Sequence, residues 1–291
     1  MTKQINTTTW QQRIRSYRKH PGSLILFVLV CLAALITAAA LLFVVGYILV
    51  KGIPHLSLSL FEWKYTSENV SLMPALINTL FMTVLALLFA VPVGIGAAIY
   101  LTEYAGRGNK LVNFVRITAE TLSGIPSIVY GLFGSLFFVK ALHMGLSLLS
   151  GALTLAIMIL PLIMRTTEEA LLAVPDSYRE GSFGLGAGRL RTVARVVLPS
   201  AIPGILSGVI LGIGRIVGES AALIFTAGTV PEVANSLFDS TRTLAVHMYS
   251  ISGEGLYIDE TYATAVVLLV VVIAINALSS VVAKKLSKNE K

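Results

Sequence analysis

Residues 73–101 read MPALINTLFMTVLALLFAVPVGIGAAIYL, an apolar run without a charged side chain. A helix needs roughly 20 apolar residues to cross a bilayer core about 30 Å thick, so this run predicts a membrane-spanning helix. Five further runs of this kind occur at 23–50, 113–139, 145–164, 199–228 and 262–283. The sequence therefore predicts an all-α integral membrane protein with six transmembrane helices.

The composition of the whole chain agrees with this class. Of 291 residues, 55% are hydrophobic and 13% are charged, about half the charged share of a soluble domain. No segment is long enough to form a folded basic face for nucleic acid. The single cysteine, Cys31, excludes a disulfide framework and a cysteine metal site. Ala38 to Ala40 could imitate a signal-peptidase site, but apolar sequence continues to Val50, which favours an uncleaved span.

The distribution of lysine and arginine predicts the orientation. Cytoplasmic segments of membrane proteins carry an excess of basic residues. One alternate set of segments holds 17 of the 22 basic residues, the opposite set holds Lys51, Lys64, Lys140 and Arg242, and Arg215 lies inside a span. We therefore expect both termini in the cytoplasm: a tail at 1–22, a six-span domain at 23–283 with a long inner loop at 165–198, and a tail at 284–291.

The long inner loop is predicted to be structured. Pro175-Asp176-Ser177 is a plausible helix start, and the residues that follow it form a short amphipathic helix. Residues 190–198 have valines at helical spacing beside Arg191 and Arg195, as in a helix on the membrane surface. From physics alone, two readings stay open: a basic loop held by anionic lipid, and a docking site for a soluble partner.

A spaced motif in this loop resembles a known family. ABC-importer permeases carry Glu-Ala-Ala, three residues, Gly, nine residues, then Ile, one residue, Leu-Pro. Here Glu180-Gly181-Ser182, Gly186 and Val196-Val197-Leu198-Pro199 follow the same spacing. The resemblance implies a type I ABC-importer permease architecture with a coupling helix that docks on a cytoplasmic ATPase. It assigns this role to Asp176, Ser177, Tyr178, Arg179, Glu180, Gly181, Ser182, Phe183, Gly186, Leu198 and Pro199.

The spans narrow the resemblance to the phosphate-importer permeases, and to the PstA type more than the PstC type. The segments that carry it are Asn78-Thr79-Leu80, Pro92-Val93-Gly94, 98–105, 123–131 and 214–222. The resemblance implies a prokaryotic inner-membrane subunit that carries inorganic phosphate and contacts membrane lipid. Its expected partners are a PstC-type permease, PstB-type ATPase subunits that bind ATP and Mg, and an external PstS-type phosphate-binding protein. The alternatives are a permease for molybdate or sulfate, or the PstC-like subunit.

The chain itself is predicted to bind no cofactor. It has no Gly-Lys dipeptide and hence no P-loop, and its four histidines lack metal-ligand spacing. We therefore expect a transport subunit without an ATP site of its own, driven by another chain.

Arg215 and Glu219 are candidate pathway residues because they lie in an apolar run. Four residues place them about 40° apart on a helix. They form either a structural ion pair between helices, or an anion site in which the guanidinium meets phosphate oxygens. The family resemblance favours the second reading. Arg165, at the end of the fourth span, has a transport role or reaches the headgroups, and Glu120 is expected to pair with Arg116.

Prolines and glycines mark the other pathway candidates. Pro92, Pro126 and Pro161 interrupt three successive predicted spans, and each leaves a helix carbonyl without its usual partner. Broken helices often line substrate routes in transporters, so Ser123, Gly124 and Ser127 are further candidates. Static kinks fit the same sequence. The glycines at 204, 208 and 212 predict close helix packing.

Overall fold

The computed structural model describes residues 21–105 and 109–288, and the regular elements of these residues are all helical. The chain divides into two units, Met1–Lys51 and Gly52–Lys291. The first unit contributes the helix α2 (Pro21–Gly52), which is continuous through the three alanines that resembled a cleavage site. Most of the predicted N-terminal tail, and the last residues of the C-terminal tail, lie outside the described residues.

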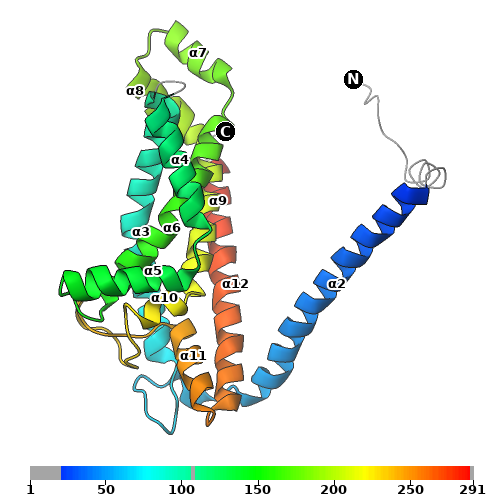
Figure 1. Cartoon of the computed structure of the whole chain (residues 1–291), viewed down its shortest axis with the longest axis vertical. Coiled ribbons are helices and arrows are strands. Elements are labelled where there is room, and N and C mark those ends of the chain that lie inside the picture. The colour runs from blue at the N-terminus through cyan, green and yellow to red at the C-terminus, as the bar shows by residue number, and fades with distance from the viewer. Residues whose placement is uncertain (1–20, 106–108, 289–291) are drawn as a thin grey trace. The chain divides into compact units, whose positions relative to one another are not determined.

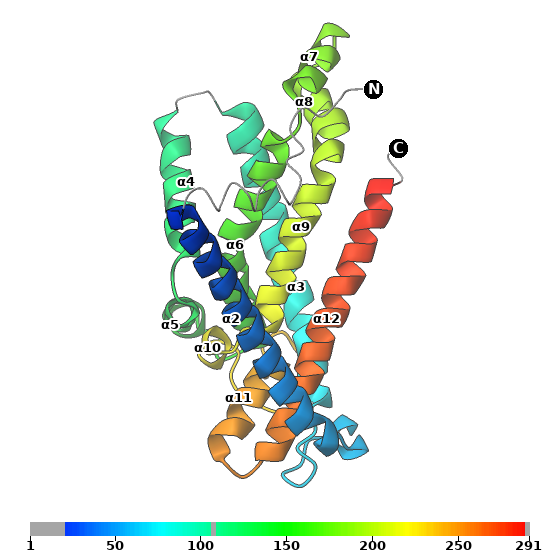
Figure 2. The same cartoon turned by 90° about the vertical axis from the view of Figure 1, so that its right-hand side faces the viewer.

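The second unit is built on long helices that run along its length (Figures 1 and 2). These are α3 (Met73–Ile99), α4 (Lys110–Ser123), α6 (Leu148–Leu172), α9 (Leu198–Val217) and α12 (Ile258–Lys288). Helix α6 packs between α3 and α9, and α12 packs on α9. Their shared core contains Met82, Leu155, Ile159, Ile163 and Ile216, each at most 1% exposed.

The third predicted span, 113–139, is interrupted at Pro126, as the sequence predicts. Helix α4 ends at Ser123, and α5 (Ser127–Gly134) leaves it at an angle of 104° before a π-helix, η4 (Ser135–Ala141). Pro126 has no N–H to donate to the carbonyl of Leu122, and that oxygen accepts from the Ile125 N–H at 3.1 Å and from the Tyr130 hydroxyl at 2.8 Å. The interruptions predicted at Pro92 and Pro161 are wrong, because both prolines lie inside continuous helices.

The fifth predicted span, 199–228, differs at both ends. Helix α9 ends at Val217, and the short α10 (Ala221–Ile224) follows after a break. At the other end, α8 (Arg189–Thr192), the π-helix η5 (Val193–Val197) and α9 form one helical run, Arg189–Val217. The separate surface helix predicted at 190–198 is therefore part of this span. Within the described residues five helices are long and apolar enough to span a membrane, and α4 with α5 would make a sixth.

The two ends of the second unit carry different elements. One end holds the π-helix η3 (Tyr100–Tyr104), the start of α4, and α7 (Asp176–Gly184), and α12 finishes at the same end (Figure 1). We call it the inner end, because the charge asymmetry assigns these loops to the cytoplasm. The opposite, outer end holds η1 (Ile53–His55), η2 (Leu58–Phe61) and α11 (Leu244–Glu254).

Candidate functional site

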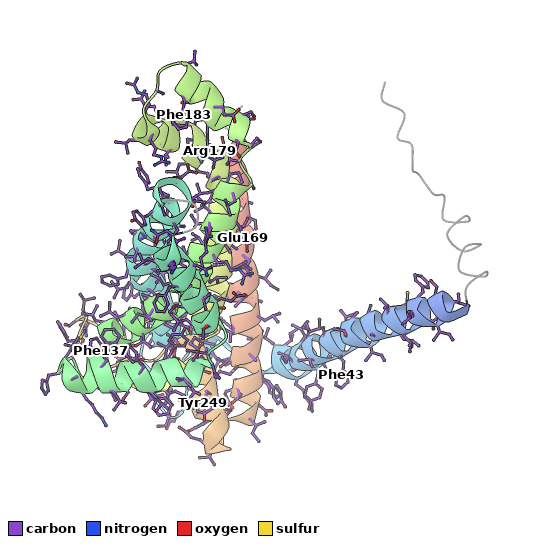
Figure 3. All side chains as sticks on the ribbon, turned by 45° about the horizontal axis from the view of Figure 1, so that its top comes forward. Phe43, Phe137, Glu169, Arg179, Phe183 and Tyr249 are labelled. Carbon is purple, nitrogen blue, oxygen red and sulfur yellow. The ribbon has the colours of Figure 1, made fainter. Side chains whose placement is uncertain are left out.

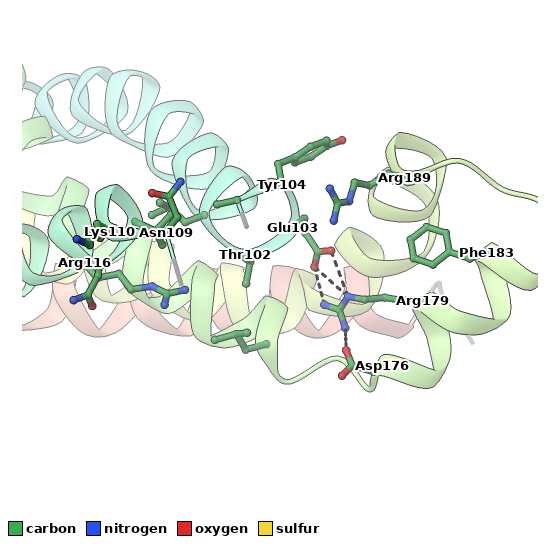
Figure 4. Close-up of a pocket in the computed structure, with 15 residues that line it drawn as sticks. Thr102, Glu103, Tyr104, Asn109, Lys110, Arg116, Asp176, Arg179, Phe183 and Arg189 are labelled. Atoms are coloured by element: carbon green, nitrogen blue, oxygen red, sulfur yellow. Dashed lines mark hydrogen bonds and ion pairs between the residues drawn. The ribbon is translucent and has the colours of Figure 1, made fainter. Parts of the chain in front are cut away.

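An ion pair at the inner end fixes the amphipathic helix α7 to the membrane-spanning helices. Arg179 of α7 donates from Nη2 to Glu103 Oε1 at 2.7 Å, and its Nε donates to the same oxygen at 3.2 Å. Both side chains are mostly buried, at 15% and 9% exposed. The hydrogen bond to Glu103 raises the pKa of Arg179 above its ordinary value. The guanidinium is therefore a fixed, charged connector between α7 and η3 (Figure 4).

The same guanidinium also binds the end of α6. Its Nη1 donates to the Val174 carbonyl at 2.8 Å, and its Nη2 donates to the Leu171 carbonyl at 2.9 Å. The last carbonyls of a helix lack hydrogen-bond donors within the helix, and Arg179 supplies donors to them. Among the residues predicted to contact an ATPase, the Arg179 side chain is turned back toward its own chain. Sequence reasoning did not assign a role to Glu103.

The rest of α7 and the turn after it project from the inner end of the bundle. Arg179 and Phe183 lie there on α7, beyond Glu169 of α6 (Figure 3). The side chains of Tyr178, Phe183 and Leu185 are 52%, 45% and 91% exposed. Gly186 has a φ of +82°, a conformation that favours glycine. The predicted coupling residues that are also exposed are Asp176, Ser177, Glu180, Gly181 and Gly186.

The remaining predicted coupling residues connect this loop to α9. The Ser182 and Thr192 hydroxyl oxygens are 2.9 Å apart, which joins α7 to α8. Leu198 and Pro199 are partly buried at the start of α9. On one side of the motif, Arg179 and Ser182 bind other parts of the chain. The exposed residues of the motif remain accessible to a partner.

Two ion pairs connect α4 to α6. Arg116 contacts Glu168 at 2.5 Å, and Arg165 contacts Glu120 at 3.8 Å. The expected pairing of Glu120 with Arg116 is therefore wrong, because each residue finds its partner on the other helix. Arg165 also donates to Glu169 at 3.1 Å and its side chain is 56% exposed.

Arg215 and Glu219 are not joined by an ion pair. No salt bridge of either residue occurs among the described residues. The reason is that α9 ends at Val217, so the two residues are not one turn apart on a continuous helix. Glu219 is 8% exposed, and its Oε1 accepts from the Ala222 N–H at 3.1 Å, at the start of α10. The structural-pair alternative has no support within this chain, and the Arg215 guanidinium contacts no carboxylate in the part of the chain that the structure describes.

The break between α4 and α5 holds the other pathway candidates. Ser123 is the last residue of α4, Gly124 follows it, and Ser127 begins α5. The Ser123 hydroxyl donates to the Glu120 carbonyl at 2.9 Å. Helix α5 contacts α10, so the break before α5 and the break after α9 belong to one region of the molecule.

Glycines allow close approach of the helices around this region. A Cβ added at Gly131 of α5 would lie 2.8 Å from the Cα of Ala222 in α10. On α9, a Cβ at Gly204 would lie 2.6 Å from the Ala170 Cβ, and one at Gly208 would overlap the Thr166 hydroxyl. The close helix packing predicted from the glycine series is confirmed at Gly204 and Gly208, with α6 as the neighbour.

At the outer end, Asn78 of α3 holds the long loop before α11. Its Nδ2 donates to the Glu232 carbonyl at 2.8 Å, and its Oδ1 accepts from the Ala234 N–H at 3.0 Å. The neighbouring Thr79 hydroxyl accepts from the Leu244 N–H at 2.8 Å. Both residues belong to a stretch that carried the family resemblance, and their buried hydrogen bonds give it a structural role.

Comparisons with known proteins agree with this architecture. The family model for the binding-protein-dependent transport system inner membrane component matches residues 90–290. The chain belongs to this permease family. The probable ABC transporter permease protein YqgI of Bacillus subtilis (strain 168) is 35% identical to it over 280 residues, covering 89% of this chain and 95% of the relative.

Two further comparisons concern a curated relative and a solved structure. The phosphate transport system permease protein PstA of Pasteurella multocida (strain Pm70) is 41% identical over 182 residues, which are 62% of this permease and 64% of the relative. The crystal structure of a bacterial ABC transporter involved in the import of alginate matches 93% of this permease and 99% of its own chain, with a TM-score of 0.60 and 16% identity. The fold is that of the ABC-importer permeases.

Proposed function

We propose that this permease is the PstA-type subunit of an ATP-driven inorganic phosphate importer and forms half of its translocation pathway. The named PstA relative supports the phosphate assignment. The observation that carries the coupling role is the fixed but exposed helix α7: Arg179 holds it to η3 and to the end of α6, while Tyr178, Phe183 and Leu185 remain open to a partner. Exposed apolar side chains at one end of a molecule favour an interaction site there.

The partners in this proposal divide the work. A PstC-type permease completes the pathway, PstB-type ATPase subunits bind ATP and Mg and receive α7, and a PstS-type protein delivers phosphate at the outer end. Closure of the ATPase subunits displaces α7. Because Arg179 binds Glu103 and the carbonyls at the end of α6, that displacement is passed directly to η3, which continues α3, and to α6.

Within the membrane, we assign anion contact first to Arg215. Its guanidinium is partly buried and carries no carboxylate partner among the described residues, so its charge is available to an anion. A guanidinium matches phosphate oxygens with two parallel hydrogen bonds and stays charged at any pH the protein meets. Glu219 acts by stabilising the break at α10, and Ser123, Gly124 and Ser127 supply polar groups at the neighbouring break. Arg165 offers a second cation toward the inner end.

Uptake of labelled phosphate tests the transport assignment. This permease, the PstC-type permease and the PstB-type ATPase are reconstituted in vesicles with ATP inside. The PstS-type protein is added outside, where it delivers phosphate. We expect uptake that needs the ATPase and is not reduced by excess molybdate or sulfate. Uptake of either competitor in place of phosphate would establish the other-oxyanion alternative, and uptake without the ATPase would indicate a channel.

Two substitutions test the role of Arg215. Arg215→Gln removes the charge and is expected to reduce phosphate uptake by about 100-fold, since a hydrogen bond to a charged group contributes about 1.5–3 kcal/mol. Arg215→Lys keeps the charge and is expected to retain part of the activity. Assembly of the complex is measured in parallel by co-purification. Wild-type uptake by an assembled Arg215→Gln complex would refute the pathway role.

Crosslinking tests the docking of α7. A cysteine at Ser177, which is exposed on α7, is combined with cysteines in the surface groove of the ATPase in a Cys31→Ser background. We expect an oxidant to form a crosslink whose yield changes with ATP. The absence of any crosslink in an active complex would contradict docking through this helix.

The PstC-like alternative is tested by co-expression, because a PstA-type chain requires a PstC-type partner for assembly.

A further inference from the structure

A cavity of about 910 Å³ lies at the inner end, between η3, the start of α4, the end of α6, α7 and α8. Lys110 and Arg116 lie on one side of it, and Arg179 and Arg189 lie on the other (Figure 4). Its acidic lining residues are Glu103 and Asp176. The lining is therefore predominantly cationic.

Most of these charges are already matched, but two are not. Arg179 is paired with Glu103 and Asp176, and Arg116 is paired with Glu168. Lys110 and Arg189 form no ion pair among the described residues. The Arg189 guanidinium lies 5.7 Å from the centre of the Tyr104 ring, which orients it without neutralising it. The cavity thus has a cation on each of two opposite sides that no described carboxylate neutralises.

The start of α4 adds donors to the same cavity. Asn109 and Lys110 begin this 14-residue helix and line the cavity. The Asn109 side chain accepts from the Leu111 N–H at 3.0 Å, so only one of the first N–H groups is taken by the cap. The remaining N–H groups and the helix dipole favour an anion at this position.

The outer surface of α4 indicates the source of the anion. Leu111, Phe114 and Ile117 recur at helical spacing and are 61%, 68% and 56% exposed. They form an apolar face directly beside Lys110, on a helix that enters the membrane from the inner end. This combination of an apolar face and a basic pocket at the cytoplasmic interface matches the sites where anionic lipid headgroups bind.

We propose that this cavity binds a phosphate-bearing anion between Lys110 and Arg189, and that its source is the headgroup of an anionic phospholipid of the inner leaflet. The lipid's acyl chains lie along Leu111, Phe114 and Ile117. The bound headgroup bridges α4 to α8 next to the Arg179–Glu103 pair, so that an inner-leaflet lipid becomes part of the coupling region. This site is separate from Arg215 and does not depend on which anion is transported.

Lipid retention by the assembled complex tests the proposal. The complex is purified in detergent, titrated with phosphatidylglycerol or with zwitterionic phosphatidylcholine, and examined by native mass spectrometry. We expect saturable binding of phosphatidylglycerol only. The double variant Lys110→Gln/Arg189→Gln is expected to weaken it about tenfold or more. Lys140→Gln/Arg191→Gln removes the same charge at positions that do not line the cavity and is expected to bind as the wild type does.

A charge-conserving variant and a second ligand complete the test. Lys110→Arg/Arg189→Lys is expected to retain phosphatidylglycerol, which separates loss of charge from loss of structure. Calorimetric titration with inorganic phosphate in phosphatidylcholine discs distinguishes the source. Binding of inorganic phosphate that Lys110→Gln/Arg189→Gln abolishes supports the anion site and overturns the lipid assignment. If Lys110→Gln/Arg189→Gln keeps its phosphatidylglycerol but loses the ATPase subunits, the cations belong to a protein interface and the proposal is overturned.

Discussion

At the scale of single residues, Arg179 shows how one side chain can serve two surfaces of a helix. It belongs to the motif that resembles an ATPase-docking element, yet its guanidinium binds Glu103 and two carbonyls of its own chain. A docking helix that transmits force has to be rigid against the body that it moves. The neighbouring Tyr178 and Phe183 remain exposed, so anchoring and docking are divided between adjacent side chains.

Removing one partner of this pair is expected to uncouple the transporter. Glu103→Ala leaves the Arg179 charge mostly buried without its carboxylate, a change that costs about 3 kcal/mol. We expect a lower melting temperature and more ATP hydrolysed per phosphate transported. Asp259→Asn serves as the control, because Asp259 lies outside the coupling loop, is 63% exposed, and its contact with His55 contributes less than about 1 kcal/mol. A Glu103→Ala complex with the wild-type ratio of hydrolysis to transport would contradict the connector role.

His247 predicts a pH dependence of stability at the outer end. Burial lowers the pKa of His247 to about 3, and the nearby charge of Arg242 acts in the same direction. Histidine in an unfolded chain titrates near 6.5, so between about pH 6.5 and 3 the unfolded chain binds a proton that the folded chain does not. The free energy of unfolding therefore falls as the pH is lowered through this range, by at most about 1.4 kcal/mol per pH unit.

Melting temperatures between about pH 7.5 and 5 measure this effect. The decrease on acidification is expected to be smaller for His247→Gln than for the wild type. His143→Asn changes an exposed histidine and tolerates its φ of +53°, so it is expected to keep the wild-type slope. Equal slopes for all three proteins would show that His247 titrates normally.

At the scale of elements, three similar prolines have two different outcomes. Pro92 and Pro161 stay within α3 and α6, whereas the chain turns by 104° at Pro126. The turn is supported by the Tyr130 hydroxyl on the Leu122 carbonyl and by the close approach of Gly131 to α10. The contact between Gly131 and α10 joins residues far apart in the sequence, so the local pattern around each proline cannot by itself distinguish a break from a tolerated proline.

The sequence predicts local features of the chain well and predicts contacts between distant residues poorly. The apolar runs locate the long helices, because a span needs only a local excess of apolar residues. The Arg179–Glu103 pair joins positions 76 residues apart. Arg116 and Glu120 both pair with residues of α6 and not with each other. A sequence pattern records the spacing along one helix and not the partner across from it. The end of α9 at Val217 is not predicted from the sequence, because apolar residues continue beyond Gly218.

Packing between α6 and α9 gives a prediction at this scale. Gly208→Ala would place a Cβ against the Thr166 side chain, and overpacking of this kind costs about 1–3 kcal/mol. We expect a lower melting temperature of the purified permease. Gly212→Ala lies one turn further along α9, where the nearest atom would be 3.8 Å away, and is expected to be neutral. If both variants melt alike, close contact at Gly208 is not a determinant of stability.

At the scale of the whole molecule, charge sorts the second unit into two ends. The coupling loop, η3 and the start of α4 lie at one end with most of the basic side chains, and the long loop before α11 lies at the other (Figure 2). Residues 229–261 at this outer end carry Glu232, Asp239, Glu254, Asp259 and Glu260, with Arg242 as their basic residue. Lysine and arginine in short loops set the orientation of a membrane protein, and here the same bias supplies the cations of the inner cavity.

Thiol labelling of two exposed leucines tests this orientation. Leu185 is 91% exposed at the inner end, and Leu256 is 80% exposed at the outer end. The experiment uses a Cys31→Ser background and a thiol reagent that cannot cross the membrane holding the permease. Added to the outer face of that membrane in intact cells, the reagent is expected to label Leu256→Cys and not Leu185→Cys. Inside-out vesicles are expected to reverse the result, because the excess of basic residues retains the Leu185 end in the cytoplasm. Labelling of Leu185→Cys from outside would place the coupling helix on the side without ATP and would refute the transport model as a whole.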